Sequence, residues 1–441
     1  MLRRSMLLAG LAGAFAFASA PDVMAQQAQP GNQGGSVIFF HPDGFGVNHW
    51  GFVRMMTVGP DGRLNWDRLP AIAVYTGHMK DALTGTSHGG ATVHAYGVKV
   101  QADSFGQDGN QRIRSLSGFE GSIAHEAMRR GKAVGLVQSG AAYEPGTAAF
   151  VASTERRANL AEITRLVVES GVDVHLAGGE RWYLPRGVQG RFGEGAREDG
   201  RNLIEELRQR GYHIVFTRDE LKAVPDSVTK LWGIFAHDHT FNDRTEEELA
   251  QRNLPLYVET APTIAEMSAA ALRILARNPN GFLLVSEEEG TDNFGNRNNA
   301  RGALEAGRRA DEAIGLFIEF VRNNPNTLML TTADSDAGGL QVVGPRRGHE
   351  QIAEGRNLPE RDRNGAPYDG QNGTGTQAWL SAPDRNGNRH AFAVTWAAWD
   401  DVSGGILVRG IGAGSEHITG TMDNTDIYRV MYRQLFGQVI N

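Results

Sequence analysis

Acidic side chains recur directly after short apolar runs that have the composition of buried strands. Four positions stand out by their local pattern: Asp43, Glu287, Asp334 and the pair Asp400/Asp401. Ligands of open α/β sheets bind outside the carboxyl ends of the strands, so these carboxylates could converge on one site. Asp is also common in turns, which is sufficient to explain any one of these positions. Four recurrences together favour a carboxylate-lined metal site.

The elements that must position these residues are strands alternating with helices. Continuous apolar runs predict strands at residues 36–40, 133–137, 172–176, 213–216, 281–285, 327–332, 391–396 and 405–408. Apolar residues at helical spacing predict helices over residues 263–277 and 300–322. Because apolar strands separated by helices are typical of buried parallel sheets, we expect an α/β fold with a large, mostly parallel sheet sandwiched between helices.

The N-terminal segment has the features of an export signal. Residues 1–25 combine two adjacent arginines, an apolar run and a terminal Val-Met-Ala, which is typical of a signal peptide. The paired arginines also permit the twin-arginine route. The Gly/Gln-rich residues 26–35 are expected to be a disordered lead-in, and residues 36–441 one domain with a Gly/Asn-rich surface insertion at residues 354–390. The sequence thus predicts a periplasmic or secreted protein.

Composition excludes several classes of function. Among 441 residues, 44 Lys and Arg stand against 51 Asp and Glu, a formal net charge of −7. The chain therefore lacks the basic field with which proteins bind nucleic-acid duplexes. The absence of cysteine excludes disulfides, thiolate zinc sites and cysteine nucleophiles. No segment after the signal is apolar and long enough to predict a membrane span.

Five collinear segments make the chain recognisable, because they resemble the motifs of the alkaline phosphatase family. They are residues 37–46 (Val-Ile-Phe-Phe-His-Pro-Asp-Gly-Phe-Gly), 84–99, 262–287, 330–340 and 420–427. The resemblance covers essentially all of the chain after the signal. It implies that family's fold and the hydrolysis of phosphate esters through a covalent phosphoserine.

The resemblance also implies residues that bind and attack the phosphoryl group. Ser87 matches the nucleophile and precedes a segment that could start a helix. A serine at that point is more often an N-cap, and one residue can serve both roles. Arg157 lies where the family's phosphate-clamping arginine is expected, with Arg156 as the alternative. His88 is a candidate for contact with substrate, whereas other nearby histidines are expected to be structural.

The metal ligands implied by the resemblance fall into two groups. The first group contains the ligands that this sequence retains: Asp43, Ser87, Glu287, Asp292 and Asp334. The three expected histidines are replaced by Asn296, Ser335 and Asp401, or by Asp400 if the loop is one residue longer. Zinc favours nitrogen and sulfur ligands, whereas calcium and magnesium suit oxygen. We therefore expect an oxygen-only site that binds Ca²⁺ and/or Mg²⁺ rather than Zn²⁺.

A third cation site of the family is partly retained. Asp43 and Glu287 would contribute to it, with Glu144 ranked before Thr147 as the remaining ligand. Thr86 stands where many family members have an aspartate that positions the phosphate-clamping arginine, so the orientation of Arg157 is left open.

The sequence therefore predicts a metal-dependent phosphomonoesterase that acts on small phosphorylated substrates through Ser87. A phosphodiesterase or a sulfatase could use the same fold, but the chain has neither the cysteine nor the modification motif of sulfatases. A catalytically silent cation- or phosphate-binding protein is favoured by the missing histidines and opposed by Ser87 and Arg157. The natural substrate and the oligomeric state stay open, with a homodimer among the options.

Overall fold

The computed structural model describes residues 34–345 and 350–440, which belong to one compact unit. The predicted signal peptide and residues 26–33 of the lead-in lie outside the described residues. No helix in the described ranges combines the length and the apolar character needed to cross a membrane.

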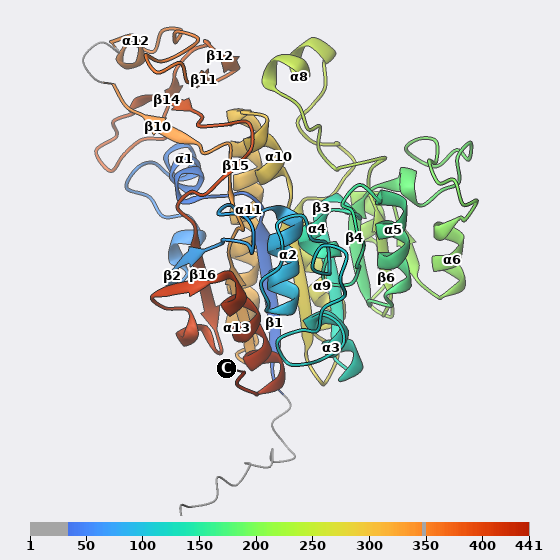
Figure 1. Ribbon diagram of the computed structural model, residues 1–441. Coiled ribbons are helices and arrows are strands. Elements are labelled where there is room, and N and C mark those ends of the chain that lie inside the picture. Colours follow the sequence, from blue (N-terminus) through green and yellow to red (C-terminus); the bar gives the residue numbers. More distant parts are fainter. Residues whose placement is uncertain (1–33, 346–349, 441) are drawn as a thin grey trace, which may run out of the picture. The chain divides into compact units, whose positions relative to one another are not determined.

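A ten-stranded sheet runs through the unit in the order β17-β2-β16-β8-β1-β7-β3-β4-β6-β5 (Figure 1). Its strands are β1 (Ser36–Pro42), β2 (Ala71–Thr76), β3 (Ala133–Ala141), β4 (Val174–Gly178), β5 (His213–Val215), β6 (Leu231–Ile234), β7 (Phe282–Glu288), β8 (Thr327–Thr331), β16 (Leu407–Gly412) and β17 (Thr421–Asp423). Strand β16 is antiparallel to both of its neighbours, and the remaining neighbouring pairs are parallel. The predicted α/β fold with a mostly parallel sheet is confirmed.

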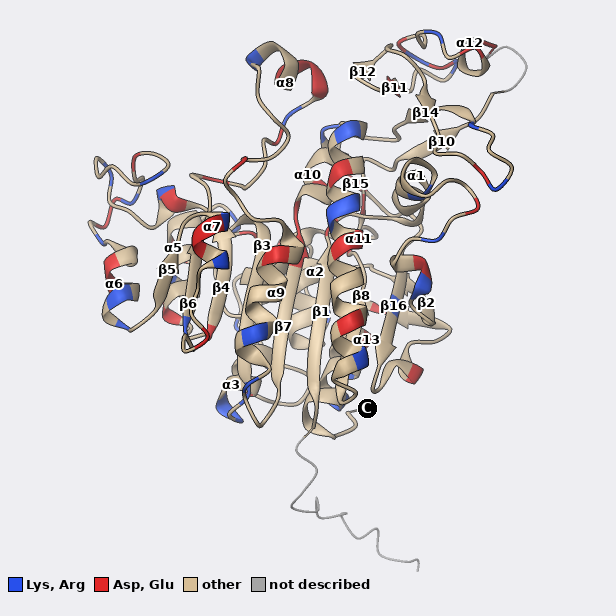
Figure 2. Ribbon diagram, turned by 180° about the vertical axis from the view of Figure 1, so that it is seen from behind, with Lys and Arg blue, Asp and Glu red and all other residues tan. Residues whose placement is uncertain are grey.

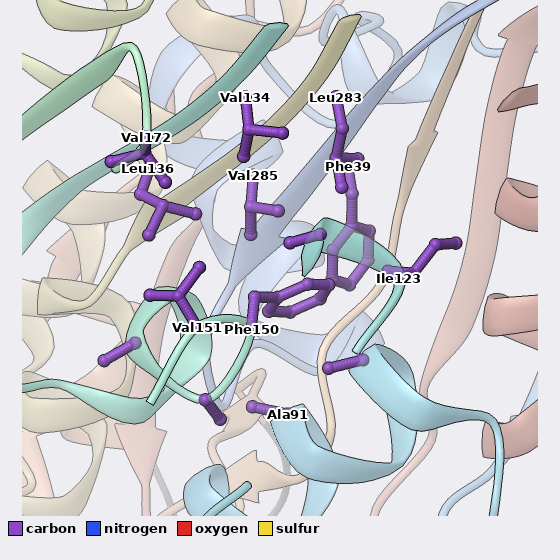
Figure 3. Close-up of a cluster of buried hydrophobic side chains, with 14 of the residues drawn as sticks. Phe39, Ala91, Ile123, Val134, Leu136, Phe150, Val151, Val172, Leu283 and Val285 are labelled. Carbon is purple, nitrogen blue, oxygen red and sulfur yellow. The ribbon is translucent and has the colours of Figure 1, made fainter. Parts of the chain in front are cut away.

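Helices cover both faces of this sheet because its central strands are apolar on both sides. In β1, Val37 and Phe39 belong to one hydrophobic core, and Ile38 and Phe40 belong to the other. The first core contains residues from α2 (Ser87–Tyr96), α3 (Ile123–Arg129), α5 (Leu160–Glu169), α6 (Leu203–Gln209) and α13 (Asn424–Phe436), and from α4 (Pro145–Ala148) and the residues after it. Figure 3 shows this core around Phe39 and Phe150, whose ring centroids are 6.0 Å apart.

The second core lies on the opposite face. It contains residues from α1 (Val47–Thr57), α7 (Arg218–Lys222), α9 (Ile264–Leu275), α10 (Gly290–Asn296) and α11 (Ala300–Asn323). Figure 2 shows α9 and α11 lying across the sheet from this side. Helix α9 begins with a capping box in which the Thr263 hydroxyl accepts from the Glu266 N–H, and the Glu266 carboxylate accepts from the Thr263 N–H. The observed bounds of α9 and α11 lie close to the predicted helices.

A small antiparallel sheet takes three of its five strands from the segment expected as an insertion. Its strands are β10 (Gln341–Val343), β11 (Tyr368–Gly370), β12 (Gly373–Thr374), β13 (Trp379–Leu380) and β14 (Ala391–Thr395). It has a small core of its own: Ile352, Leu358, Tyr368, Ala378 and Ala393. The remaining elements of the described residues are α8 (Glu246–Arg252), α12 (Glu350–Ala353), a two-stranded ribbon of β9 (Asp336–Ala337) and β15 (Asp401–Val402), and three short 3-10 helices at Trp66–Arg68, Glu180–Trp182 and Ser415–His417.

Candidate active site

Four adjacent strands bring acidic residues to one edge of the main sheet. In the order β8-β1-β7-β3 these strands are mutually parallel, so their carboxyl ends lie side by side. Asp334 follows β8, Asp43 directly follows β1, Glu287 lies at the end of β7, and Glu144 follows β3. The structure therefore brings together carboxylates that are separated by up to 291 residues in the sequence.

Two groups of side chains in this cluster are close enough to share a cation. Asp43, Glu289 and Asp292 each offer a carboxylate oxygen within 4.8 Å of the others, and so do Asp43 and Glu287 with a ring nitrogen of His41. All are buried. Glu289 and His41 were not among the ligands predicted from the sequence. Glu289 directly follows β7 and is the N-cap of α10, so its place beside Asp292 depends on the fold and not on a local sequence pattern.

The cluster carries an excess of buried negative charge without enough donors. Both carboxylate oxygens of Asp43 and of Glu289, together with Glu287 Oε2 and Asp334 Oδ2, are buried without a hydrogen-bond partner among the described residues. Burial and the neighbouring carboxylates raise the pKa of Asp43 to about 7 and the pKa values of Glu289 and Asp334 well above their usual range. Unpaired buried carboxylates of this kind fit a hard divalent cation.

Asn296 lies between two of the predicted ligands. Its amide nitrogen donates to Asp292 Oδ1 at 3.0 Å and to Asp401 Oδ1 at 3.0 Å, while its carbonyl oxygen accepts from the Gly338 N–H at 3.1 Å. Asn296 thus separates two carboxylates as a hydrogen-bond donor, and its own oxygen is already used. Asp400 is exposed, which leaves Asp401 as the residue of that pair that faces the cluster.

Ser87 is the first residue of α2 and is buried. The N-cap of this helix is Thr86, whose hydroxyl accepts from the Gly89 N–H at 3.1 Å and donates to the Ala102 carbonyl at 2.7 Å. The Ser87 hydroxyl has no hydrogen-bond partner among the described residues. The first turn of α2 packs against the cluster, since a Cβ on Gly90 would lie 2.6 Å from the Asp334 Cβ. Thr86 therefore has the capping role, and the Ser87 hydroxyl is left without a cap to form at the start of α2.

Arg157 is oriented by Glu144. Its Nη2 donates to Glu144 Oε2 at 2.8 Å, and the other oxygen of Glu144 lies 3.8 Å from His239 Nε2. Arg157 lines the cleft above the cluster, whereas Arg156 is exposed and does not line it. Glu144, which was expected as a cation ligand, is thus the acidic partner of Arg157, and its binding of a cation stays a prediction.

The other predicted residues have partners of their own. His88 lies in α2, and its Nε2 is 3.2 Å from Asp103 Oδ1. Ser335 is buried, and its hydroxyl donates to Asp334 Oδ1 at 3.3 Å. Thr147, the alternative to Glu144, accepts a hydrogen bond from Gln138 Nε2 at 2.5 Å.

An open cleft of about 650 Å³ leads to the cluster. Its lining includes Glu144, Arg157, Asp292, Asn296 and Asp401. The Arg157 guanidinium thus lies in the same cleft as the carboxylates of Asp292 and Asp401. The cleft is large enough for a small ester but leaves no room for a buried macromolecular ligand.

A sequence profile of the alkaline phosphatase family matches residues 35–436. The chain belongs to the alkaline phosphatase family. Alkaline phosphatase 4 of Bacillus subtilis is 25% identical over 378 residues, which cover 78% of this chain and 75% of that protein. The alkaline phosphatase of Gadus morhua is 26% identical over 341 residues, or 69% of each chain.

Solved structures show the same fold. The alkaline phosphatase of Thermus thermophilus superposes with a TM-score of 0.68 at 22% identity and covers 95% of this chain and 96% of its own. The alkaline phosphatase of the Antarctic bacterium TAB5 gives a TM-score of 0.67 at 18% identity, and the match covers 91% of this chain and 98% of that one. Membership in the alkaline phosphatase family confirms the recognition made from the sequence. It supports a metal-binding hydrolase of the phosphatase type.

Proposed function

We propose that this protein is an exported, metal-dependent phosphomonoesterase that hydrolyses small phosphate monoesters through a phosphoserine on Ser87. The observation that carries the proposal is the free hydroxyl of Ser87 at the start of α2, against a cluster of buried carboxylates with unpaired oxygens. Arg157, held by Glu144, supplies the cation for the non-reacting phosphoryl oxygens.

Asp43, Glu287, Glu289, Asp292, Asp334 and Asp401 would hold the cations, with Ser335 near Asp334. Bound divalent cations stabilise negative charge on the attacking and leaving oxygens and favour deprotonation of a hydroxyl. The oxygen-rich donor set suits Ca²⁺ or Mg²⁺ better than Zn²⁺. Within the described part of the chain, His41 is the imidazole that lies close enough to Asp43 and Glu287 to share a cation with them.

The residues of the chain divide the reaction into two displacements. Ser87 Oγ loses its proton to solvent and forms a bond to phosphorus while the bond from phosphorus to the leaving oxygen breaks, and that oxygen takes up a proton from solvent to become the alcohol. Water then attacks phosphorus, the bond from phosphorus to Ser87 Oγ breaks, and a proton from the water restores the Ser87 hydroxyl as orthophosphate leaves. Arg157 holds the phosphoryl group through both steps, and the N-terminus of α2 adds a favourable dipole.

Substitution of the nucleophile tests the proposal. Ser87→Ala should lower turnover of p-nitrophenyl phosphate by several orders of magnitude and abolish the covalent phosphoenzyme that can be trapped in acid. Thr92→Ala, about one and a half turns after Ser87 in the same helix, is the matched control for helix integrity. A phosphoenzyme in Ser87→Ala, or near-normal turnover, would remove Ser87 from the mechanism.

Metal removal separates the enzyme from a silent binding protein. Chelation should abolish turnover in the wild type, and Ca²⁺ or Mg²⁺ should restore it. If the purified protein binds Ca²⁺ and orthophosphate but turns over neither phosphate monoesters nor phosphodiesters, a binding function replaces the proposed one. Turnover of bis-p-nitrophenyl phosphate above that of p-nitrophenyl phosphate would instead indicate a phosphodiesterase.

A further inference from the structure

A large aromatic side chain stands open to solvent at the mouth of the cleft. Trp399 lies in the loop between β14 and β15, two residues before Asp401, and is 59% exposed. It lines the same cleft as Arg157 and Asp292. Among the described residues its indole N–H has no hydrogen-bond partner, and its ring packs on no other aromatic ring.

The fold buries other tryptophans nearby, so the exposure of Trp399 is specific to its position. Trp396, three residues earlier, is 2% exposed and donates to Asp369 Oδ2 at 3.0 Å. Trp379 is 5% exposed and donates to the Asp369 carbonyl at 3.1 Å. Both bury their rings and satisfy their N–H groups, as tryptophan usually does in a folded protein. Trp399 does neither.

The cleft lining offers little other apolar surface. Besides Trp399 it includes Thr84, Thr86, Asp243, Asn293 and Arg297, and the described residues that line it contain no other large apolar side chain. His239 also lines the cleft, and its imidazole stacks on Phe241 with ring centroids 5.1 Å apart. Among the described residues, Trp399 therefore offers the main flat apolar face that a ligand in this cleft could contact.

The direction of the reaction places the leaving group on the open side of the cleft. The attacking and leaving oxygens lie roughly in line through phosphorus, so the leaving group points away from Ser87. Ser87 is buried, and Thr84, Gly85 and Thr86, which directly precede it, line the same cleft as Trp399. The leaving group, and not the phosphoryl group, is therefore the part of the substrate that can reach the indole.

We propose that Trp399 forms a leaving-group subsite that favours phosphate monoesters of planar aromatic alcohols, whose rings stack on the indole. This inference rests on the proposed phosphomonoesterase function. Stacking of a flat ring on an aromatic side chain tolerates many ring types, because each presents a π-face. Esters of flexible aliphatic alcohols lack such a face and gain less from the subsite.

Kinetics of three variants test the subsite. In Trp399→Ala, the ratio of kcat/KM for phenyl phosphate to kcat/KM for glycerol 2-phosphate should fall about tenfold, mainly through KM. Trp399→Phe should retain most of the wild-type ratio. Leu380→Ala removes an exposed apolar side chain of the small sheet that does not line the cleft, and should leave the ratio unaltered. An unchanged ratio in Trp399→Ala would overturn the proposal.

A binding experiment decides the same point without turnover. Phenylphosphonate, which cannot be hydrolysed, should quench the tryptophan fluorescence of the wild type but not that of Trp399→Phe, whereas methylphosphonate should quench neither. Equal quenching in both proteins would remove the subsite. If no monoester is hydrolysed, the proposed function fails, and the fluorescence titration still shows whether Trp399 binds the ring. Hydrolysis of glycerol 2-phosphate without any Trp399-dependent selectivity would sustain the function and reject the subsite.

Discussion

Arg157 can hold a phosphoryl group only if its guanidinium is kept in place before substrate arrives. Glu144 does this with a 2.8 Å hydrogen bond, and both side chains line the cleft. The paired carboxylate lowers the freedom of the arginine and leaves its other N–H groups for phosphate oxygens. The neighbouring Arg156 has the same chemistry but is exposed.

The first prediction concerns these two arginines. Arg157→Ala should weaken inhibition by orthophosphate by about 2–4 kcal/mol, as expected for the loss of a charge-assisted bidentate contact. Arg156→Ala is the matched control and should change the inhibition constant less than twofold. Glu144→Gln should give an intermediate loss because the hydrogen bond survives without its charge. A large effect in Arg156→Ala alone would show that the wrong arginine was assigned.

The second prediction concerns the identity of the metal. Asn296 donates to both Asp292 and Asp401, so an imidazole at this position would stand between two carboxylates. Asn296→His, alone and with Ser335→His, should therefore raise the Zn²⁺ content relative to Ca²⁺ after dialysis against an equimolar mixture, by at least about tenfold in the double variant. Asn293→His adds an imidazole to the same cleft, but not at the position between Asp292 and Asp401, and serves as the control. Two zinc ions in active wild-type protein would contradict the preference for Ca²⁺ or Mg²⁺ that this oxygen-rich donor set predicts.

At the scale of elements, the sequence revealed those with strong local signals. The apolar runs predict β1, β7 and β8, which are buried throughout, and the helical spacing of apolar residues predicts α11, which is buried on one face. Strand β2 was missed since its residues alternate between buried and exposed and its run is short. The antiparallel direction of β16 could not be read either, because strand direction depends on the connections and not on the residues of the strand.

The candidate site was readable only in part for a similar reason. Asp43, Ser87 and Asp334 stand in recognisable motifs, whereas the part that Glu289 plays depends on its distance from Asp292 in the folded chain. The role of Glu144 toward Arg157 likewise needs the end of β3 and the loop at residue 157 to meet. Such contacts between distant segments leave no trace in local composition.

The third prediction tests whether the start of α2 positions the nucleophile. Thr86→Ala removes the side-chain acceptor of the Gly89 N–H and should cost about 1 kcal/mol of stability. It should also lower kcat, because the cap fixes the turn that carries Ser87. Thr263→Ala removes the equivalent acceptor at the start of α9, away from the cleft, and should cost similar stability with little effect on kcat. Equal kcat in both variants would show that α2 needs no cap for catalysis.

At the scale of the whole molecule, a core histidine and the acidic cluster make the free energy of unfolding depend on pH in opposite directions. His175 stacks on Trp232 with ring centroids 4.4 Å apart, and its burial lowers its pKa to about 3. Its contribution to stability is present above the pKa of an unfolded histidine, near 6.5, and is lost as pH falls toward 3. The acidic cluster behaves in the opposite way, because burial raises the pKa of Asp43 from 3.8 to about 7.

The fourth prediction uses this opposition to isolate the cation site. Without metal, the Asp43 carboxyl stabilises the fold below about pH 4, and this contribution is lost as pH rises through about 7. Each such proton changes the free energy of unfolding by about 1.4 kcal/mol per pH unit within that window. Bound Ca²⁺ replaces the protons, so the rise in Tm on adding Ca²⁺ should be small at pH 5 and grow steadily toward pH 8. His175 contributes equally with and without Ca²⁺, and therefore cancels in the difference between the two Tm values.

The Asp43→Asn variant is the control. The rise in Tm on adding Ca²⁺ should grow less with pH in this variant, because one of the buried charges is gone. If the Tm shift is the same at pH 5 and pH 8 in the wild type, protons and cations do not compete for the cluster, and the buried carboxylates are not the cation ligands.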